Sequence, residues 1–240
     1  MSVGVNDVRQ LGTILGIWAH PDDETFSMAG IMAAAVENGQ KVVCISATRG
    51  EAGVQDENRW PAKTLGQTRT KELQAAMKHL GVTTHYWLDY PDGGCCDCDK
   101  YEAVRQIAKI IKKYSPDSIF TFGPDGMTGH ADHRIVSYWV SAAVVASGSN
   151  AKVYHAVQTI DQYKSMKELD KTFDIFFNID VPPVFEERDC AVCFNLTPRL
   201  FNKKLLALQA MPSQTEGILR MFDHILTDSV GVEAFRLYQG

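Results

Sequence analysis

The chain lacks the charge pattern of a protein that binds nucleic acid. Its 240 residues include 24 Lys and Arg against 29 Asp and Glu, so the formal net charge is −5. No tract rich in Lys and Arg occurs along the sequence, whereas a protein that binds a phosphate backbone presents a clustered basic surface. We therefore expect no nucleic acid among its partners.

Apolar runs long enough for a membrane are missing as well. The longest apolar stretch, residues 135–146, is too short to cross a bilayer and contains Ser137 and Ser141. Residues 1–12 are polar and lack the charged start and apolar core of a secretion signal. These features predict a cytoplasmic protein without a membrane span.

No internal repeat, low-complexity tract or linker divides the sequence. A chain of 240 residues, 45% of them hydrophobic, can bury one sizeable core without cross-links. We expect a single domain over residues 1–240, with the motif-bearing core at about residues 13–157 and further strands and helices over residues 158–240.

Five of the six cysteines fall into two groups that could suggest a second metal site. Cys95, Cys96 and Cys98 form one group, and Cys190 and Cys193 form a Cys-x-x-Cys pair. The pair lies in an apolar, strand-like run, where residues three apart point to opposite faces and do not chelate one ion. We expect ordinary reduced thiols at these positions.

Short apolar runs alternate with helical patterns, and this alternation predicts a wound α/β sheet. Strands are expected over residues 13–19, 41–47, 82–88, 117–122 and 151–157, and helices over 24–38, 66–80, 101–114 and 131–146. The C-terminal part predicts helices over 162–169, 199–211 and 214–226, strands over 174–179 and 190–196, and irregular chain over 180–188. Right-handed connections then give a Rossmann-like, mostly parallel sheet of order 3-2-1-4-5 with helices on both faces.

Two clusters of acidic and imidazole side chains follow the first and fourth predicted strands. Residues 19–24 read Ala-His-Pro-Asp-Asp-Glu, and residues 129–133 read Gly-His-Ala-Asp-His. The predicted strand order makes these strands neighbours, so both clusters reach the carboxyl edge of the sheet, where crevices form. An Asp-Asp pair before a helix is by itself usually a cap, but two histidine-bearing clusters at one edge indicate an active site.

The spacing within each cluster suits a divalent metal ion. His20 and Asp23 are three residues apart, as are His130 and His133, and groups with this spacing can share one face of a helical turn. Two imidazoles and one carboxylate would leave positions open for water and substrate, which is typical of catalytic metal sites. Asp22 and the remaining histidine could then act as the base and the acid of a hydrolysis.

Two other classes of function stay open from the residues alone. The same ligand set suits a non-haem Fe(II) oxygenase, although a second carboxylate beside the ligand carboxylate favours hydrolysis. A non-catalytic module could instead hold a nucleotide or a sugar in the crevice. No Gly-x-Gly-x-x-Gly fingerprint follows the first strand, however, and the acidic run at residues 22–24 would repel a phosphate there.

These motifs resemble those of the LmbE-like superfamily of zinc-dependent de-N-acetylases, also called the PIG-L or GlcNAc-phosphatidylinositol deacetylase family. Residues 48–53 resemble the family's Thr-Arg-Gly-Glu-x-Gly, and Arg69-x-x-Glu72-x-x-x-Ala76 and the Leu-Asp-Tyr-Pro-Asp-Gly of residues 88–93 are also family-like. The resemblance spans about residues 14–145, with a weaker echo near the C-terminus. There, Met211-Pro-Ser-Gln stands where many relatives have His-x-Ser-Gln.

The resemblance implies a metal-dependent hydrolase that removes an N-acetyl, or similar N-acyl, group from an amino sugar such as an N-acetylglucosamine conjugate. It makes His20, Asp23 and His133 the ligands of Zn²⁺, with Fe²⁺ as the alternative ion in the cell. Asp22 would be the general base. His130 would stabilise the tetrahedral intermediate or protonate the amine, with Asp132 orienting it.

The resemblance also suggests residues that line the sugar pocket, namely Arg49, Glu51, Arg69 and Asp92. For Arg49, Arg69 and Asp92 an ion pair is an equal explanation. Several kinds of conjugate could present the same acetamide, and the sequence does not choose among them. Residues 230–237 form an apolar segment that we expect to be exposed and available for assembly into a homo-oligomer.

Overall fold

The computed structural model describes residues 7–173, 175–176, 178–221 and 230–238. Its strands are β1 (Ile14–Trp18), β2 (Val42–Thr48), β3 (His85–Tyr90), β4 (Ser118–Phe122), β5 (Lys152–Thr159), β6 (Val184–Phe185), β7 (Val192–Asn195) and β8 (Val232–Leu237). Its α-helices are α1 (Asp23–Glu37), α2 (Ala62–Leu80), α3 (Lys100–Tyr114), α4 (Ala131–Ser147), α5 (Ile160–Phe173), α6 (Pro198–Gln209) and α7 (Pro212–Met221). Short 3₁₀ turns occupy Val8–Leu11, Cys95–Asp97 and Glu187–Asp189.

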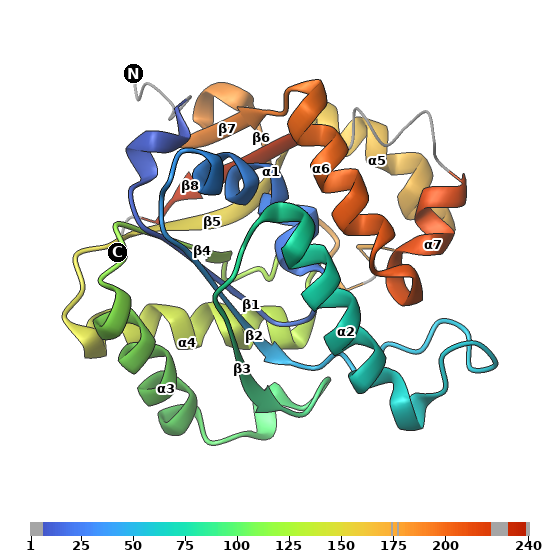
Figure 1. Cartoon of the computed structure of the whole chain (residues 1–240), viewed down its shortest axis with the longest axis horizontal. Helices are drawn as coiled ribbons and strands as arrows, with labels where there is room; N and C mark the ends of the chain where they lie inside the picture. The colour runs from blue at the N-terminus through green and yellow to red at the C-terminus, as the bar shows by residue number, and fades with distance from the viewer. Residues whose placement is uncertain (1–6, 174, 177, 222–229, 239–240) are drawn as a thin grey trace.

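One mixed sheet forms the centre of the described structure. Its strands follow the order β3-β2-β1-β4-β5-β8-β7, and β6 pairs with β5 beside this path. Helices α1, α2 and α6 cover one face, while α3 and α4 cover the other (Figure 1). The predicted α/β sheet with the order 3-2-1-4-5 is therefore confirmed, and the C-terminal segment extends it with antiparallel strands.

The central strands read as nearly unbroken apolar runs because both of their faces are covered. Every residue of β1, β2 and β4 is buried. Trp18 at the end of β1 meets Phe122 at the end of β4 edge to face, with ring centroids 5.0 Å apart. This packing fixes the carboxyl ends of β1 and β4 next to each other, which is where the two sequence clusters begin.

The predicted strands and helices up to residue 159 all occur, with shifted ends. Helix α2 begins at Ala62, directly after Pro61, and not at residue 66. Strand β3 begins at His85 and not at residue 82, because residues 81 and 82 close the preceding helix. Gly81 has φ 77°, and the amides of Gly81 and Val82 donate to the carbonyls of Lys78 and Met77.

The strand predicted over residues 174–179 is wrong for the part that the structure describes. Helix α5 continues to Phe173, and residues 175, 176 and 178 form a turn in which the Ile179 amide donates to the Phe176 carbonyl. Phe176 is buried and packs against Tyr163 of α5, at 5.8 Å between ring centroids. The apolar run is thus a turn folded back on its own helix, while residues 174 and 177 lie outside the described residues.

The sequence predicts an exposed segment at 230–237, and this is wrong for the centre of the segment. It contains β8, which lies between β5 and β7 and pairs with both in antiparallel fashion. Ala234 and Phe235 are buried, and Phe235 packs edge to face on Phe120 at 4.8 Å. Leu237 at the end of the strand is exposed, and assembly through this segment stays a prediction.

The remaining C-terminal predictions hold in outline. The predicted short helix at 162–169 is the longer α5, and the strand at 190–196 is β7. The helix at 199–211 is α6, and the one at 214–226 is α7, with residues 222–226 outside the described part. Residues 180–188 are irregular except for the two-residue strand β6 and the start of a 3₁₀ turn. Within the described chain, no helix combines the length and apolar character needed to span a bilayer.

Candidate metal centre

The two sequence clusters meet at the carboxyl edge of the sheet. Strands β1 and β4 pair in parallel, so the chain leaves both strands on the same side. His20 lies in the turn between β1 and α1, and His133 lies in the first turn of α4. Although 113 residues separate them, His20 Nδ1 lies 3.1 Å from His133 Nε2.

Asp23 completes a group of three potential ligands. Its Oδ2 lies 3.6 Å from His20 Nδ1, and its Oδ1 lies 3.4 Å from His133 Nε2. A tetrahedral zinc ion with bonds of about 2.0 to 2.1 Å holds neighbouring ligand atoms roughly 3.3 to 3.4 Å apart. The structure therefore brings the three side chains predicted as metal ligands together, with a different oxygen of Asp23 facing each imidazole. The groups of potential ligands within 4.8 Å of one another are His20 with His130 and His133, and His20 with Asp92 and Asp132.

The outer nitrogen of each imidazole already has an acceptor. His20 Nε2 lies 2.9 Å from Asp92 Oδ1 and 3.2 Å from Asp132 Oδ2. His133 Nδ1 lies 2.9 Å from the Gly126 carbonyl oxygen. When each ring donates through this outer nitrogen, its inner nitrogen carries a lone pair that faces the other ring. In that tautomer the two inner nitrogens could coordinate one cation, so this donor set fits a metal ion.

The charges around the pair act in opposite directions on its two rings. Burial lowers the pKa of His20, but the carboxylates of Asp132 and Asp92 outweigh this effect and raise it to about 10. Burial, together with the His20 and His130 rings, holds the pKa of His133 well below its ordinary value. The pair is thus built to hold one positive charge in a buried, acidic surrounding.

His130 stands beside the pair, and its ring forms no ion pair with a carboxylate of the described residues. Its ring centroid lies 4.7 Å from that of His20 and 5.0 Å from that of His133. Nitrogen atoms of these three histidines lie within 4.8 Å of one another, so His130 is a further potential ligand. Its Nδ1 accepts the Asp132 backbone amide at 3.2 Å and caps α4. Burial and the nearby His20 lower the pKa of His130.

Asp132 contacts a different histidine from the one that the sequence suggested. Its carboxylate faces His20, and only its backbone amide bonds to His130. Oδ2 accepts the Gly93 amide at 2.8 Å and Oδ1 accepts the Cys95 amide at 3.1 Å. The loop after β3 therefore turns this carboxylate, which is completely buried, toward the outer nitrogen of His20.

Asp22 has an unusual backbone conformation for a residue with a side chain. Its φ is 147° and its ψ is −29°, a region that costs about 1–3 kcal/mol and occurs mostly at functional sites. Its Oδ2 accepts a hydrogen bond from Arg69 Nη2 at 3.2 Å. Burial raises the pKa of Asp22 to about 6, although the Arg69 charge acts to lower it. Asp22 and Asp23 are adjacent, but their carboxylates contact different partners.

Arg69 reaches Asp22 because the loop after β2 gives it room. The guanidinium is buried and donates to the carbonyl oxygens of Gly50 at 2.8 Å and Pro21 at 2.9 Å. Gly50 has φ 68°, and a Cβ atom there would lie 2.2 Å from the guanidinium carbon. The close approach of Arg69 thus requires the glycine of the Thr-Arg-Gly-Glu motif. Of the two predictions for Arg69, a sugar contact or an ion pair, the structure contains the ion pair, with Asp22.

Glu51 and Asp92 tie the loops after β2 and β3 together. Asp92 Oδ2 accepts the Ala52 amide at 2.8 Å, and Glu51 Oε1 accepts the Asp92 amide at 3.0 Å. Burial raises the pKa of Asp92, but the bond from His20 outweighs it and holds the value at about 2. The other oxygen of Glu51, Oε2, is buried and has no partner among the described residues.

Arg49 lies apart from this cluster. Its Nε donates to Asp89 Oδ1 at 2.7 Å, its Nη1 donates to Thr70, and its guanidinium stacks 4.3 Å from the Trp87 ring centroid. These partners hold it across β2, β3 and α2. Arg49 thus forms the ion pair that was one of its two predictions, and a sugar contact stays a prediction.

Sequence reasoning left Glu24 and the C-terminal motif without a role. Glu24 is completely buried beside Asp22 and accepts the Thr25 hydroxyl at 2.6 Å, and burial raises its pKa to about 8. The only sequence signal was its position as the third acid of the first cluster. Ser213 binds the Glu72 carboxylate through its amide and its hydroxyl.

The C-terminal motif also reaches the loop after β2. Gln214 Nε2 donates to the Gly53 carbonyl oxygen at 3.0 Å. Met211, which replaces the histidine of many relatives, is buried in the main apolar core. The motif therefore fastens α7 to the loop that supports Arg69, and the Met211 side chain packs in the core.

The cysteines take no part in a metal site within the described structure. All six are free thiols, and no group of potential ligands found there includes one. Cys95 contributes its backbone amide to Asp132. Ordinary reduced thiols remain the expectation for these positions.

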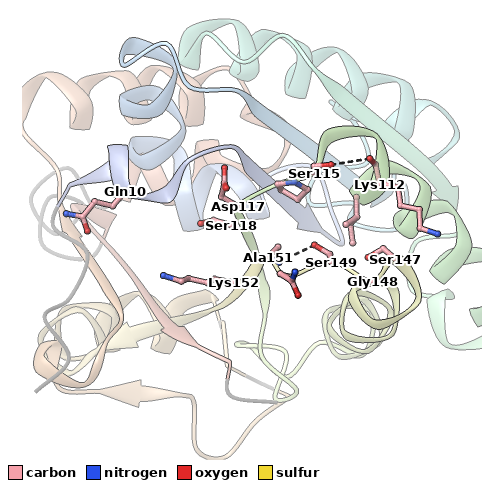
Figure 2. Close-up of a pocket in the computed structure, with 13 residues that line it drawn as sticks. Gln10, Lys112, Ser115, Asp117, Ser118, Ser147, Gly148, Ser149, Ala151 and Lys152 are labelled. Carbon is pink, nitrogen blue, oxygen red and sulfur yellow. Dashed lines mark hydrogen bonds between the residues drawn. The ribbon is translucent and has the colours of Figure 1, made fainter.

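A separate hollow of about 600 Å³ lies at the opposite edge of the sheet, where β4 and β5 begin (Figure 2). It is lined by the ends of α3 and α4 and by polar side chains such as Lys112, Asp117 and Lys152. The Asp117 carboxylate accepts a hydrogen bond from the Thr13 amide at 2.7 Å. The histidine cluster lies at the carboxyl edge, where wound sheets bind their ligands, so we place the functional site there.

Fold and cluster together define a wound α/β protein with a buried group of His and Asp side chains at the carboxyl edge of its sheet that could hold a metal ion. The chain belongs to the PIG-L family, described as GlcNAc-PI de-N-acetylase, and the family match covers residues 15–144. The resemblance drawn from the sequence motifs is thereby confirmed.

Curated proteins that are similar to the chain are named as deacetylases. The chain is 32% identical, over 60% of its length, to a 1D-myo-inositol 2-acetamido-2-deoxy-alpha-D-glucopyranoside deacetylase of Kineococcus radiotolerans. It spans about half of that relative's length, 52%.

Two solved structures share the fold at low sequence identity. N,N'-diacetylchitobiose deacetylase from Pyrococcus horikoshii superposes with a TM-score of 0.69 at 21% identity, over 98% of this chain and 86% of that one. The 4-carboxy-2-hydroxymuconate hydratase from Pseudomonas putida superposes with a TM-score of 0.64 at 14% identity, over 95% and 97%. The same fold thus occurs in a deacetylase and in a hydratase.

Proposed function

We propose that the chain is a metal-dependent hydrolase that removes an N-acetyl, or similar N-acyl, group from an amino sugar or its conjugate. The observation that carries this proposal is the group of His20, Asp23 and His133, with Asp22 beside it and held apart from it by Arg69. The name of the Kineococcus relative supports the same class of reaction.

His20, Asp23 and His133 would hold the metal ion, and we propose Zn²⁺, since two imidazoles and one carboxylate form a known ligand set for catalytic zinc. A zinc ion bound there would polarise the amide carbonyl and lower the pKa of a water molecule to about 7. Fe²⁺ accepts the same donors and is the second candidate ion.

Asp22 would act as the general base. Its carboxylate is partly exposed, with 18% of the side chain accessible, so it can receive a proton from the attacking water molecule. Arg69 donates both to Asp22 and to the Pro21 carbonyl oxygen, which fixes the position of the carboxylate. We therefore assign Arg69 a positioning role, acting through Asp22.

His130 would protonate the leaving amine or stabilise the oxyanion. Its Nδ1 accepts the Asp132 amide, so in the neutral ring the proton sits on Nε2, which is the nitrogen left to face a substrate. Asp132 would act on His20, because its carboxylate faces that ring. Its contribution would be to fix the orientation of a metal ligand.

On the substrate side, Glu51 is the acceptor that remains available. Both oxygens of Asp92 have partners within the protein, His20 and the Ala52 amide. The Oε2 atom of Glu51 is buried and has none among the residues described. We therefore propose that Asp92 supports His20. A contact between Glu51 and a sugar hydroxyl stays a prediction from the sequence, since the loop after β2 would have to move to expose Oε2.

The substitution Asp22→Asn tests this mechanism. It should leave the metal content unchanged and lower the rate of acyl release about 10²- to 10⁴-fold, because the general base is lost. Acetate release from a panel of N-acetylglucosamine conjugates and elemental analysis of the protein measure the two effects. Arg105→Gln serves as the control, since Arg105 is an exposed residue of α3 that pairs with Glu102, and it should behave like the parent. An Asp22→Asn protein that turns over at the parent rate would show that Asp22 is not the base.

The same assay decides between the hydrolase and its two rivals. Iron-dependent oxygen consumption without acetate release would favour an Fe(II) oxygenase. Tight nucleotide binding by metal-free protein, again without acetate release, would favour a binding module. A cytoplasmic location and a homo-oligomeric state remain predictions from the sequence.

A further inference from the structure

An apolar cavity of about 190 Å³ adjoins the proposed metal ligands. Asp23 and His133 form part of its wall, and the remainder comes from α1, β5, α5, α7, β8 and the loop after β4. Apolar side chains make up most of this lining, among them Phe26, Met127, Val157, Met166, Ile218 and Val232. The site therefore continues into an apolar cavity that has no role in the proposed function described above.

The cavity and the polar groups lie on opposite sides of the cluster. Arg69 and Asp92 approach it from α2 and from the loop after β3, on the β2 and β3 side of the sheet. The cavity reaches from His133 toward β5 and β8, on the other side. In an amide, the nitrogen and the acyl chain are bonded to the carbonyl carbon in different directions. A polar amino sugar on the first side would therefore direct the acyl chain into the cavity.

The size of the cavity exceeds what an acetyl group requires. An apolar protein cavity of about 150 Å³ holds a benzene molecule, which has six carbon atoms. By the same measure, 190 Å³ accommodates roughly six to eight carbon atoms. A single methyl group would leave most of this space unfilled, and unfilled apolar volume lowers protein stability.

We propose that this cavity is an acyl-chain subsite and that the chain prefers N-acyl substrates longer than N-acetyl, with optimal chains of about six carbon atoms. This inference rests on the proposed hydrolase function and narrows its substrate class. Atoms balance as in any amide hydrolysis: water adds to the carbonyl carbon, the C–N bond breaks, and a carboxylate and an amine are released.

A series of N-acylglucosamines with acetyl, butyryl, hexanoyl and octanoyl groups tests the proposal. Release of free amine should give a kcat/KM that rises about four-fold for each buried methylene through hexanoyl, and the rise should end toward octanoyl, where the cavity is full. A second series keeps the acetyl group and lengthens the glycoside from methyl to hexyl, and it should show no such rise. A kcat/KM that falls from butyryl onward, or that rises only with the glycoside, would overturn the proposal.

Filling the cavity provides a matched pair of variants. Ile218 lines the cavity, whereas Arg220 lies on the outside of the same helix, where its side chain is 71% exposed. Ile218→Trp should lower the ratio of hexanoyl to acetyl turnover at least about ten-fold, and Arg220→Trp should leave the ratio unchanged. Circular dichroism verifies that both variants fold. Equal ratios in the two folded variants would contradict the assignment.

A binding measurement separates this proposal from the proposed function. Calorimetric titration with hexanoate and with acetate should show tighter hexanoate binding by the parent, and Ile218→Trp should lose this preference. If no N-acyl sugar is hydrolysed, the hydrolase proposal fails, but the titration still tests whether the cavity binds an acyl chain. If acetyl groups are released but hexanoate binds no better than acetate, the subsite alone is wrong.

Discussion

His20 connects every part of the proposed site. Its Nδ1 faces His133 and Asp23, and its Nε2 faces Asp92 and Asp132. The inner contacts bring potential metal ligands together, and the outer contacts fix the ring and its tautomer. A substitution behind the ring should therefore act on the metal without removing a ligand.

Asp132→Asn makes this change. The amide keeps the shape of the side chain but removes the charge that faces His20 and accepts the Gly93 and Cys95 amides. We expect zinc affinity to fall about 10- to 100-fold, measured by competition with a chelator. Asp89→Asn, an exposed carboxylate that pairs with Arg49, should bind zinc like the parent. Equal affinities in all three proteins would rule out the role given to Asp132.

At the residue scale the sequence motifs predicted which side chains meet, but not which atoms face each other. The contact of His20, Asp23 and His133 follows from strand order and three-residue spacing. The direction of the Asp132 carboxylate depends on the course of residues 93–95, whose amides hold it. Arg49 and Arg69 look alike in sequence, and only the packing of β2, β3 and α2 separates a surface ion pair from a buried one.

At the scale of elements, helix α1 is interrupted within its own length. Met28 has φ −146° and ψ 19°, which leaves backbone groups on either side of it without helical partners. Lys204 Nζ donates to the Phe26 carbonyl oxygen at 2.6 Å. Glu233 accepts the amides of Gly30 and Ile31, both at 2.8 Å. Because of the break, the first turn of α1 can place Asp23 beside His20 and His133, while the rest of the helix packs against α6.

Lys204 and Glu233 also form an ion pair at 2.9 Å that is completely buried. Lys204→Met should leave the Glu233 charge without its partner and lower the free energy of unfolding by about 3–5 kcal/mol, as measured by guanidinium denaturation. The double variant Lys204→Met, Glu233→Gln removes both charges and should lose less. A single variant as stable as the parent would show that the pair does not hold α1 in place.

Glu37 of α1 forms ion pairs with Arg199 and Lys203 of α6, and these pairs predict an effect of pH on stability. Bonds from Arg199 and Lys203 hold the pKa of Glu37 at about 2, below its ordinary 4.5. A lowered folded-state pKa stabilises the protein above pH 4.5, and the effect is lost as the pH falls from there toward 2. Because the side chain is partly exposed, the effect should stay below about 1 kcal/mol.

Denaturation at pH 6 and pH 3 measures this effect. The parent should lose more stability on acidification than Glu37→Gln, which cannot titrate at this position. High salt should reduce the difference, because the pair is accessible to solvent. Identical losses in both proteins at low salt would contradict the assignment.

Element prediction from sequence succeeded where strands and helices alternate and was weaker beyond residue 159. Strand β8 was missed, because an antiparallel strand inserted between β5 and β7 has no partner nearby in sequence. The apolar run after α5 was taken for a strand, although Phe176 packs back on Tyr163. Both depend on distant packing that a local pattern does not contain.

At the scale of the whole molecule, the order of strands creates the site. Because β1 and β4 are neighbours, turns more than a hundred residues apart contribute to one cluster, as the right-handed connection rule predicts. The family match ends at residue 144, whereas β5, α5, α7 and β8 supply much of the cavity wall. The family region thus contains the proposed metal ligands, and the later elements shape the proposed acyl subsite.

The fold alone does not determine the reaction, since it also occurs in a hydratase. The account depends on whether His20, Asp23 and His133 bind one metal ion together. Calorimetric titration of metal-free protein with Zn²⁺, in the parent and in His133→Ala, tests this most directly. We predict one high-affinity site per chain in the parent and an affinity at least about 100-fold lower in the variant. Zinc binding of equal affinity in His133→Ala would contradict the account.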